Sequence, residues 1–221
     1  MKKCFAIGLL KPSPKQTRMA LACARSLRAV GHTEDIVIIT YDPEFKVDWL
    51  DVRCFSPLEH PSLDLTTTSY RLTCWCDLGK LYFWALDDYD KVIALDPDIM
   101  FFDKVEVDYW DMPSLTGINA GKFGPLCSCF MVLEPTGSGE MINTLMDSSF
   151  SYEEGWNKEG KINWKFQASN AGQGFLYYYF KFVKNSFHYF DLWTGKWFHY
   201  GGELKDSPKY QKEINGLIPY Q

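Results

Sequence analysis

Apolar runs and helix-like spacing alternate along the first hundred residues. Residues 4–10 and 35–40 are apolar runs of strand length, and residues 13–30 between them space their apolar side chains as a helix does. Ser13 followed by Pro14 predicts the start of that helix, because serine caps helices and proline fits their first turn. This strand-helix-strand order predicts a parallel sheet.

The same pattern continues along the rest of the chain, less regularly beyond residue 100. It predicts further strands at residues 53–56, 91–95 and 130–133, and helices at residues 45–51, 72–86, 139–146 and 173–184. Residues 153–165 are mostly polar, include two glycines and are predicted to loop over the surface. No internal repeat or linker divides the chain, so we expect one α/β domain.

Composition supports a globular protein. The 221 residues are 46% apolar and 23% charged, which is close to the average for folded domains. The net charge of −5 argues against a general nucleic-acid or membrane-surface binder. No apolar run approaches the roughly 20 residues of a membrane span, and the segment 11–14, with two prolines, interrupts the first run before any signal-peptide cleavage site. We therefore expect a cytoplasmic protein without a transmembrane segment.

Aromatic residues are unusually abundant, at 17%, and many lie between residues 164 and 200. Core packing accounts for most such residues, because aromatic side chains bury large areas. Sugar recognition is the alternative, since the apolar faces of a sugar stack well on Trp or Tyr.

The seven cysteines include two Cys-x-Cys pairs, Cys74 with Cys76 and Cys127 with Cys129. One-residue spacing fits no common zinc pattern, and no histidine lies nearby in the sequence. The sequence therefore predicts reduced, mostly buried thiols rather than a structural zinc site.

Two acids, Asp96 and Asp98, directly follow the predicted strand 91–95. Ligands of open α/β sheets bind at the carboxyl ends of strands, and residues two apart in extended chain point to the same side. Mn²⁺ and Mg²⁺ prefer oxygen ligands and complete their shells with phosphate oxygens. The pair could thus hold a cation against a diphosphate, although Asp-x-Asp alone is equally typical of a solvated turn.

Residues 80–100 resemble glycosyltransferase family 8, which includes glycogenin-like and bacterial galactosyltransferase-like enzymes. They show a lysine-leucine pair, an aromatic-rich helix, an acidic-tyrosine turn and a strand ending in Asp-x-Asp. Residues 126–135, 172–180 and 198–208 resemble later motifs of that family in the same order. The resemblance implies a single GT-A domain over residues 1–221, with residues 1–100 binding the nucleotide and residues 101–221 the sugar and acceptor.

The resemblance also implies roles for individual residues. Asp96, Asp98 and His199 correspond to the ligands of Mn²⁺ or Mg²⁺. The positions implied to bind a UDP-sugar donor are Leu9, Leu10, Lys11, Arg71, Lys80, Asp96, Gly202 and Lys205. Lys205 is implied to meet the donor diphosphate, Gln173 keeps the glutamine of a family motif, and Asn170 lies close enough in sequence to contact sugar hydroxyls. We take these three as the catalytic candidates.

Two positions depart from the family pattern. Gly172 stands where the family has an acid near the sugar, and Cys127 stands where it has an asparagine. Neither can serve as a carboxylate nucleophile. The resemblance implies retention, so we expect a hexose-type sugar to pass from UDP to a glycan or protein acceptor that attacks on the leaving-group face.

Two other functions fit parts of the sequence. The departures at Cys127 and Gly172 would suit a non-catalytic nucleotide-sugar or carbohydrate-binding domain. A phosphatase with Asp96 as nucleophile also uses a strand followed by Asp-x-Asp, but Ile99 follows here where Thr or Val is usual, and the motif comes late in the chain.

Overall fold

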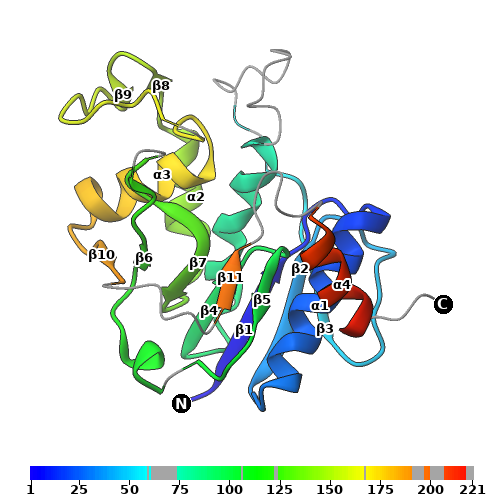
Figure 1. Cartoon of the computed structure of the whole chain (residues 1–221). Coiled ribbons are helices and arrows are strands. Elements are labelled where there is room, and N and C mark those ends of the chain that lie inside the picture. Colours follow the sequence, from blue (N-terminus) through cyan, green and yellow to red (C-terminus); the bar gives the residue numbers. More distant parts are fainter. Residues whose placement is uncertain are drawn as a thin grey trace.

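A seven-stranded sheet forms the centre of the computed structural model, which describes residues 1–58, 60, 74–105, 107–121, 124–166, 168–190, 197–199 and 207–217. Across the sheet, the strands are β10 (His188–Tyr189), β6 (Thr116–Ile118), β7 (Cys127–Leu133), β4 (Lys91–Leu95), β1 (Lys3–Gly8), β2 (Asp35–Thr40) and β3 (Asp51–Cys54). Figure 1 shows β1 and β4 near its middle.

Four neighbouring parallel strands come from residues 1–100, and β10 also pairs in parallel with β6. β1 pairs in parallel with β2 and β4, and β2 with β3. β7 runs antiparallel to both β4 and β6. The predicted α/β class with a mostly parallel sheet is thus confirmed, and the apolar runs 35–40 and 91–95 coincide with β2 and β4.

Side chains of the central strands alternate between two cores. Cys4 and Ala6 of β1 pack on one face, where they join η1, α2 and α3, whereas Phe5 and Ile7 pack on the other, where they join α1. Both faces are covered, so the parallel strands are buried on both sides and read as continuous apolar runs.

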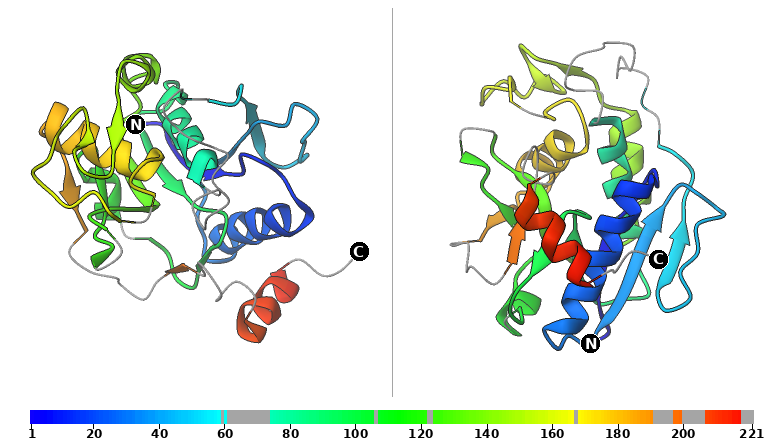
Figure 2. Two further views of the ribbon diagram at one scale, coloured as in Figure 1. Left: turned by 90° about the horizontal axis from the view of Figure 1, so that it is seen from above. Right: turned by 45° about the vertical axis from the view of Figure 1, so that its right-hand side comes forward.

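Helix α1 (Pro14–Ala29) covers one face of the sheet and is itself covered by α4 (Pro208–Leu217), as both views in Figure 2 show. The Ser13 hydroxyl accepts a hydrogen bond from the Gln16 N–H at 3.2 Å, which confirms the predicted cap.

The other face is covered by the 3₁₀ helix η1 (Cys74–Ala85), α2 (Gly139–Met146) and α3 (Gly172–Tyr178), which continues as the π-helix η4 (Tyr179–Val183). The predicted helix 139–146 coincides with α2. The described part of the predicted helix 72–86 is 3₁₀ rather than α, and the predicted helix 173–184 divides into α3 and η4. Apolar spacing of three or four residues occurs in all these helix types, so it did not separate them.

The predicted helix 45–51 is wrong. Isolated turns occupy this segment, with Phe45 N bonded to Asp42 O at 3.2 Å and Leu50 N to Val47 O at 3.1 Å. So short a segment gains too few helical hydrogen bonds to offset nucleation. β3 then begins at Asp51, so the strand predicted at residues 53–56 is displaced towards the N-terminus.

Residues 153–165 are anchored more firmly than their polarity predicts. β8 (Phe150–Ser151) and β9 (Gly155–Trp156) form a short hairpin, and both Trp156 and Trp164 are buried. Gly155 has a φ of +75°, and a Cβ there would lie 2.0 Å from the Trp164 indole nitrogen. The segment expected to be a surface loop is therefore held to the core by its two tryptophans. This agrees with the expectation that most aromatic residues serve core packing.

A second, two-stranded sheet consists of β5 (Ile99–Phe101) and β11 (Trp197–His199), which are antiparallel. A short 3₁₀ helix, η2 (Val107–Asp111), follows β5 and precedes β6. Among the helices of the described residues, none has the length and apolarity that crossing a bilayer requires.

Candidate functional site

Asp96 and Asp98 lie on the turn between β4 and β5, at the carboxyl end of the parallel strands. The Asp96 N–H donates to the Cys129 carbonyl of β7 at 2.8 Å, and the Asp96 carbonyl accepts from the Ile99 N–H at 3.3 Å. Asp98 is buried, and Asp96 is partly buried. These backbone hydrogen bonds fix Asp96, and the turn places both carboxylates at the edge where open α/β sheets bind ligands.

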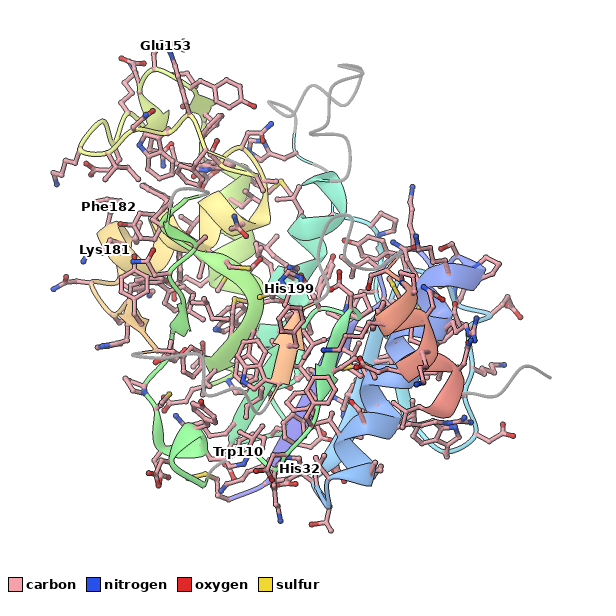
Figure 3. All side chains as sticks on the ribbon, in the orientation of Figure 1. His32, Trp110, Glu153, Lys181, Phe182 and His199 are labelled. Atoms are coloured by element: carbon pink, nitrogen blue, oxygen red, sulfur yellow. The ribbon has the colours of Figure 1, made fainter. Side chains whose placement is uncertain are left out.

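His199 reaches these acids through strand pairing. It lies opposite Ile99 in the β11–β5 pair, which places it next to Asp98. Its Nε2 lies 3.2 Å from Asp98 Oδ1, and the ligating atoms of Asp96, Asp98 and His199 all lie within 4.8 Å of one another. Figure 3 shows His199 at the end of β11, near the middle of the molecule. Two carboxylates and an imidazole fit a divalent cation such as Mn²⁺.

Lys80, from η1, is buried against the first of the two acids. Its Nζ lies 2.6 Å from Asp96 Oδ1, and it donates to Ser128 Oγ at 2.9 Å and to the Ser128 carbonyl at 3.3 Å. The resemblance implied that Lys80 contacts the nucleotide. In the structure its ammonium group contacts Asp96, and its role toward the nucleotide stays a prediction.

The ionisable groups of the site influence one another strongly. Burial raises the pKa of Asp96, the Lys80 charge opposes that rise, and Asp98 adds to it. Burial lowers the pKa of His199, but hydrogen bonds with Asp98 and Cys127 outweigh burial and raise this pKa to about 10. Imidazole ligates a metal only when neutral, so a cation bound here must displace the His199 proton.

Gln173 lies in the first turn of α3, and Asn170 lies in the turn that precedes this helix. Gln173 Oε1 accepts from the Ser128 N–H at 3.2 Å, so Gln173 reaches Lys80 through Ser128. Asn170 Oδ1 is buried and has no hydrogen-bond partner among the described residues. A buried carbonyl oxygen without a partner is costly, and it suits a ligand hydroxyl.

Leu9, Leu10 and Lys11 follow β1 at the same edge of the sheet as Asp96. The Leu9 N–H donates to the Ile39 carbonyl and the Leu10 carbonyl accepts from the Tyr41 N–H, both at 2.9 Å. Both leucines are buried, while Lys11 is exposed. The structure thus brings this predicted nucleotide segment beside the acids, because β1 pairs directly with β4.

Three predicted donor contacts, Arg71, Gly202 and Lys205, lie outside the described residues. Their roles stay predictions.

The structure adds a pair of thiols to the site. Cys127, Cys129 and His199 also offer ligating atoms within 4.8 Å of one another. Hydrogen bonds with Cys129 and His199, together with the His199 charge, outweigh burial and lower the pKa of Cys127 to about 4. The Cys-x-Cys spacing could have indicated two thiols on one side of a strand, but only the β11–β5 pairing brings the histidine.

The architecture is a GT-A type α/β fold, which the structural comparisons define. The WbbM bifunctional glycosyltransferase, in its apo form, superposes with a TM-score of 0.56 at 12% identity, over 98% of this chain and 49% of that one. The glycosyltransferase GlyE of Streptococcus pneumoniae TIGR4 superposes with a TM-score of 0.53 at 11% identity, over 86% of this chain and 45% of that one. The chain therefore spans about half the length of these two neighbours.

Sequence comparison gives one more relationship. The chain is 29% identical over 125 residues to UDP-glucuronate:xylan alpha-glucuronosyltransferase 1 of Arabidopsis thaliana, which covers 52% of this chain and 18% of that protein. No protein-family model matches the chain. The structural neighbours thus show the fold, and membership of glycosyltransferase family 8 stays a prediction.

Proposed function

We propose that this chain is the catalytic domain of a metal-dependent, retaining glycosyltransferase that moves a hexose-type sugar from a UDP-sugar to a glycan or protein acceptor. The observation that carries the proposal is the approach of Asp96, Asp98 and His199 to within 4.8 Å at the carboxyl edge of the parallel strands. A GT-A type fold with such a cluster at this edge is suited to holding a cation and a diphosphate.

The cation held by these residues would be Mn²⁺ or Mg²⁺. Its positive charge would offset the negative charge that develops on the departing diphosphate. Asp96 and Asp98 supply hard oxygen ligands, and His199 supplies a nitrogen once its proton has left. Asp98, buried and bonded to His199, fixes the orientation of the imidazole.

Lys80 and Gln173 act on the site by positioning. Lys80 holds one oxygen of Asp96, and Ser128 holds Lys80 in turn. Gln173 anchors Ser128 from α3. These contacts leave the second oxygen of Asp96 for the cation, and we keep Lys80 as a proposed contact of the donor nucleotide.

The donor would lie along the edge formed by the ends of β1 and β4. The Leu9 to Lys11 segment borders the base, with Lys11 exposed to meet a phosphate. Asn170 Oδ1 would accept from a hydroxyl of the donor sugar, which would satisfy its unpaired oxygen. Arg71, Gly202 and Lys205 are proposed as further donor contacts, with Lys205 on the diphosphate.

The transfer step needs no carboxylate nucleophile. The acceptor oxygen would attack the anomeric carbon on the face from which UDP departs, and the bond between that carbon and the diphosphate oxygen would break. The departing diphosphate would take the acceptor proton. Gly172 and Cys127 lie where acid and amide groups were expected, which favours this same-face route over a covalent intermediate.

Calorimetric titration of UDP, with and without Mn²⁺, tests the proposal. We expect binding that depends on Mn²⁺ and is lost in Asp98→Asn, while Asp103→Asn, an exposed acid nearby in sequence, binds as wild type does. Absence of UDP binding under all these conditions would overturn the assignment. Product analysis by NMR with a panel of UDP-sugars would then show whether the anomeric configuration is retained.

A non-catalytic nucleotide-sugar-binding domain is the second candidate, favoured by Gly172 and Cys127. Such a domain would bind UDP with Mn²⁺ but release no sugar. Donor hydrolysis measured with the panel of UDP-sugars separates the two, since a transferase slowly passes sugar to water when no acceptor is present.

A further inference from the structure

His199 belongs to two clusters of potential metal ligands at once. One contains Asp96 and Asp98, and the other contains the thiols of Cys127 and Cys129. The two clusters differ in chemistry, because carboxylates prefer hard cations whereas thiolates prefer soft ones such as Zn²⁺ and Cd²⁺.

The thiol cluster has the ligand set of a zinc site. Zn²⁺ is commonly bound by cysteine sulfur and histidine nitrogen, and catalytic zinc sites use three protein ligands and an open position. Tetrahedral thiolate ligands with Zn–S bonds of about 2.3 Å lie roughly 3.8 Å apart. The three ligating atoms, within 4.8 Å of one another, therefore need only small side-chain movements to meet around one ion.

The surrounding backbone holds the thiols in place. Both cysteines lie on β7, and their side chains leave the strand on the same side because they are two residues apart. β7 is hydrogen-bonded to β4 at this point, where the Cys129 carbonyl accepts from Asp96 N–H. Cys129 is buried and Cys127 is partly exposed, so an ion could reach the cluster from the side of Cys127.

We propose that Cys127, Cys129 and His199 form a binding site for a thiophilic cation such as Zn²⁺, and that this site shares His199 with the Asp96–Asp98 cluster. A neutral imidazole offers one lone pair, since its other nitrogen carries the proton. One His199 ring therefore serves one cation at a time, and Zn²⁺ at the thiols withdraws a ligand from Mn²⁺ at the acids. The existence of the thiol site is independent of the proposed function, whereas the competition rests on it.

Titration of Co²⁺ into the reduced protein tests the thiol site directly. Thiolate-to-Co²⁺ charge transfer gives a near-ultraviolet absorption that oxygen ligands do not give, and added Zn²⁺ should abolish it. Losing even an outer-shell partner costs about 10–100-fold in metal affinity, so Cys127→Ser should weaken Co²⁺ and Zn²⁺ binding at least tenfold. Asp98→Asn should keep the absorption.

Two controls make the titration decisive. Cys54→Ser removes an exposed thiol that lies in β3, outside the cluster, and should bind as wild type does. Cys129→Ala repeats the test at the buried thiol, with circular dichroism to confirm folding. An absorption that survives both Cys127→Ser and Cys129→Ala in folded protein, or that never forms in wild type, would overturn the thiol site.

Competition is measured by UDP titration in Mn²⁺ with increasing Zn²⁺. We expect Zn²⁺ to weaken UDP binding in wild type. In Cys127→Ser, the same weakening should require a Zn²⁺ concentration at least about tenfold higher. Equal sensitivity of the two proteins would overturn the sharing of His199. If wild type bound no UDP even without Zn²⁺, the proposed function would fail while the Co²⁺ spectra still decided the thiol site.

Discussion

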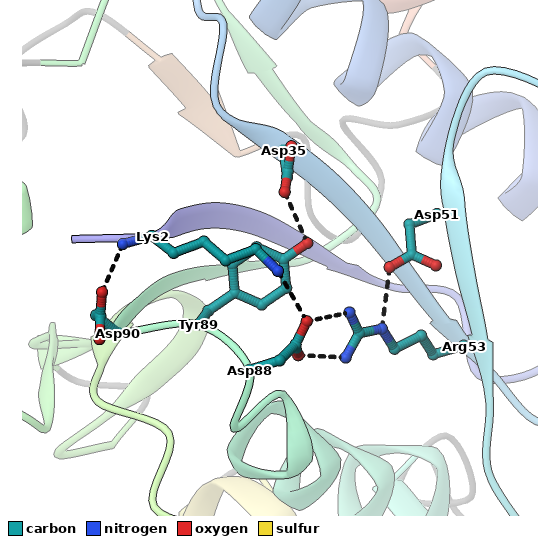
Figure 4. Close-up of polar contacts among 7 residues, drawn as sticks. All are labelled: Lys2, Asp35, Asp51, Arg53, Asp88, Tyr89 and Asp90. Atoms are coloured by element: carbon teal, nitrogen blue, oxygen red, sulfur yellow. Dashed lines mark hydrogen bonds and ion pairs between the residues drawn. The ribbon is translucent and has the colours of Figure 1, made fainter.

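Charged residues gather at both ends of the parallel strands, but the two clusters are built differently. At the amino end, Arg53 binds Asp88 through two nitrogens at 2.5 and 2.8 Å and binds Asp51 at 3.0 Å. Figure 4 shows this cluster, whose members are Lys2, Asp35, Asp51, Arg53, Asp88, Tyr89 and Asp90. The carboxyl end holds the Asp96, Asp98, Lys80 and His199 cluster.

The difference lies in how charge is balanced. At the amino end, partly exposed acids and bases pair with one another, so that the pKa of Asp88 falls and that of Arg53 rises, each mainly because of the hydrogen bonds between them. At the carboxyl end two neighbouring acids are largely withdrawn from water, and burial raises the pKa of Asp96 even beside Lys80. The ion pairs of the amino-end cluster are partly exposed, so water screens the charge of its four carboxylates and two cations, whereas the acids at the carboxyl end are balanced by Lys80 and a protonated His199. Loss of the His199 proton leaves more carboxylate than the Lys80 charge offsets, which suits a cation.

The largest contrast is expected in catalysis. Asp96→Asn should lower the release of UDP from the preferred donor at least about 100-fold, because the charge that offsets the leaving diphosphate is misplaced. Asp88→Asn changes an acid of the amino-end cluster in the same way and should leave this rate unchanged. Steady-state assays of UDP release would contradict the comparison if both variants lost activity alike.

A smaller effect is expected when Lys80 is replaced. Lys80→Met leaves Asp96 without its counter-charge and should lower the free energy of unfolding by about 2 kcal/mol, less than for a fully buried pair because Asp96 is partly exposed. Saturating Mn²⁺ should restore part of this loss by supplying the missing charge. Urea unfolding with and without Mn²⁺ measures both effects, and a loss that Mn²⁺ leaves unchanged would separate Lys80 from the cation site.

The two clusters should respond to opposite ends of the pH scale. In metal-free protein the pKa of His199 rises from 6.5 to about 10, so its contribution to stability is full below pH 6.5 and is lost as the pH rises towards 10. The pKa of Asp88 is lowered from 3.8, so its contribution is present above that value and is lost in acid.

Urea unfolding across pH, compared with His199→Gln and with Asp88→Asn, measures these contributions. The His199→Gln difference should shrink in alkali and the Asp88→Asn difference in acid. Mn²⁺ affinity should rise with pH as His199 loses its proton, and a flat profile would contradict its role as a ligand.

The smallest effect is expected from the amino-end cluster. Arg53→Met should cost only about 1 kcal/mol of stability, because its side chain and those of its partners are partly exposed and such ion pairs contribute little. UDP binding should be unchanged. Thermal unfolding in low and high salt checks this, since the wild-type advantage should shrink as salt screens the pairs.

Those parts of the fold whose signal is local could be predicted from sequence. β2, β4 and α2 coincide with their predicted ranges, and Asp96 with Asp98 follows β4 as expected. β5 and β11 were not predicted, because three residues are too few to show a periodicity. The helix predicted at residues 45–51 is wrong because apolar spacing alone does not offset the cost of helix nucleation.

The site shows the same limit. Asp96 and Asp98 could be recognised as site candidates from sequence, because both directly follow one predicted strand. His199 could be placed with them only through a family resemblance, because its neighbours are set by strand pairing between distant segments. No family resemblance linked Cys127 and Cys129 to His199, so only the structure shows that these thiols lie near the imidazole.

The β5–β11 pairing also has a consequence for the order of assembly. Its partners, residues 99–101 and 197–199, are far apart in the chain, so forming it closes a long loop at an entropic cost. The two acids can take their places once β4 and β5 have formed, but His199 joins them only when β11 has docked. A cation bound by all three favours the docked state, so the local opening of β11 would become rarer and would report whether the cation site is occupied.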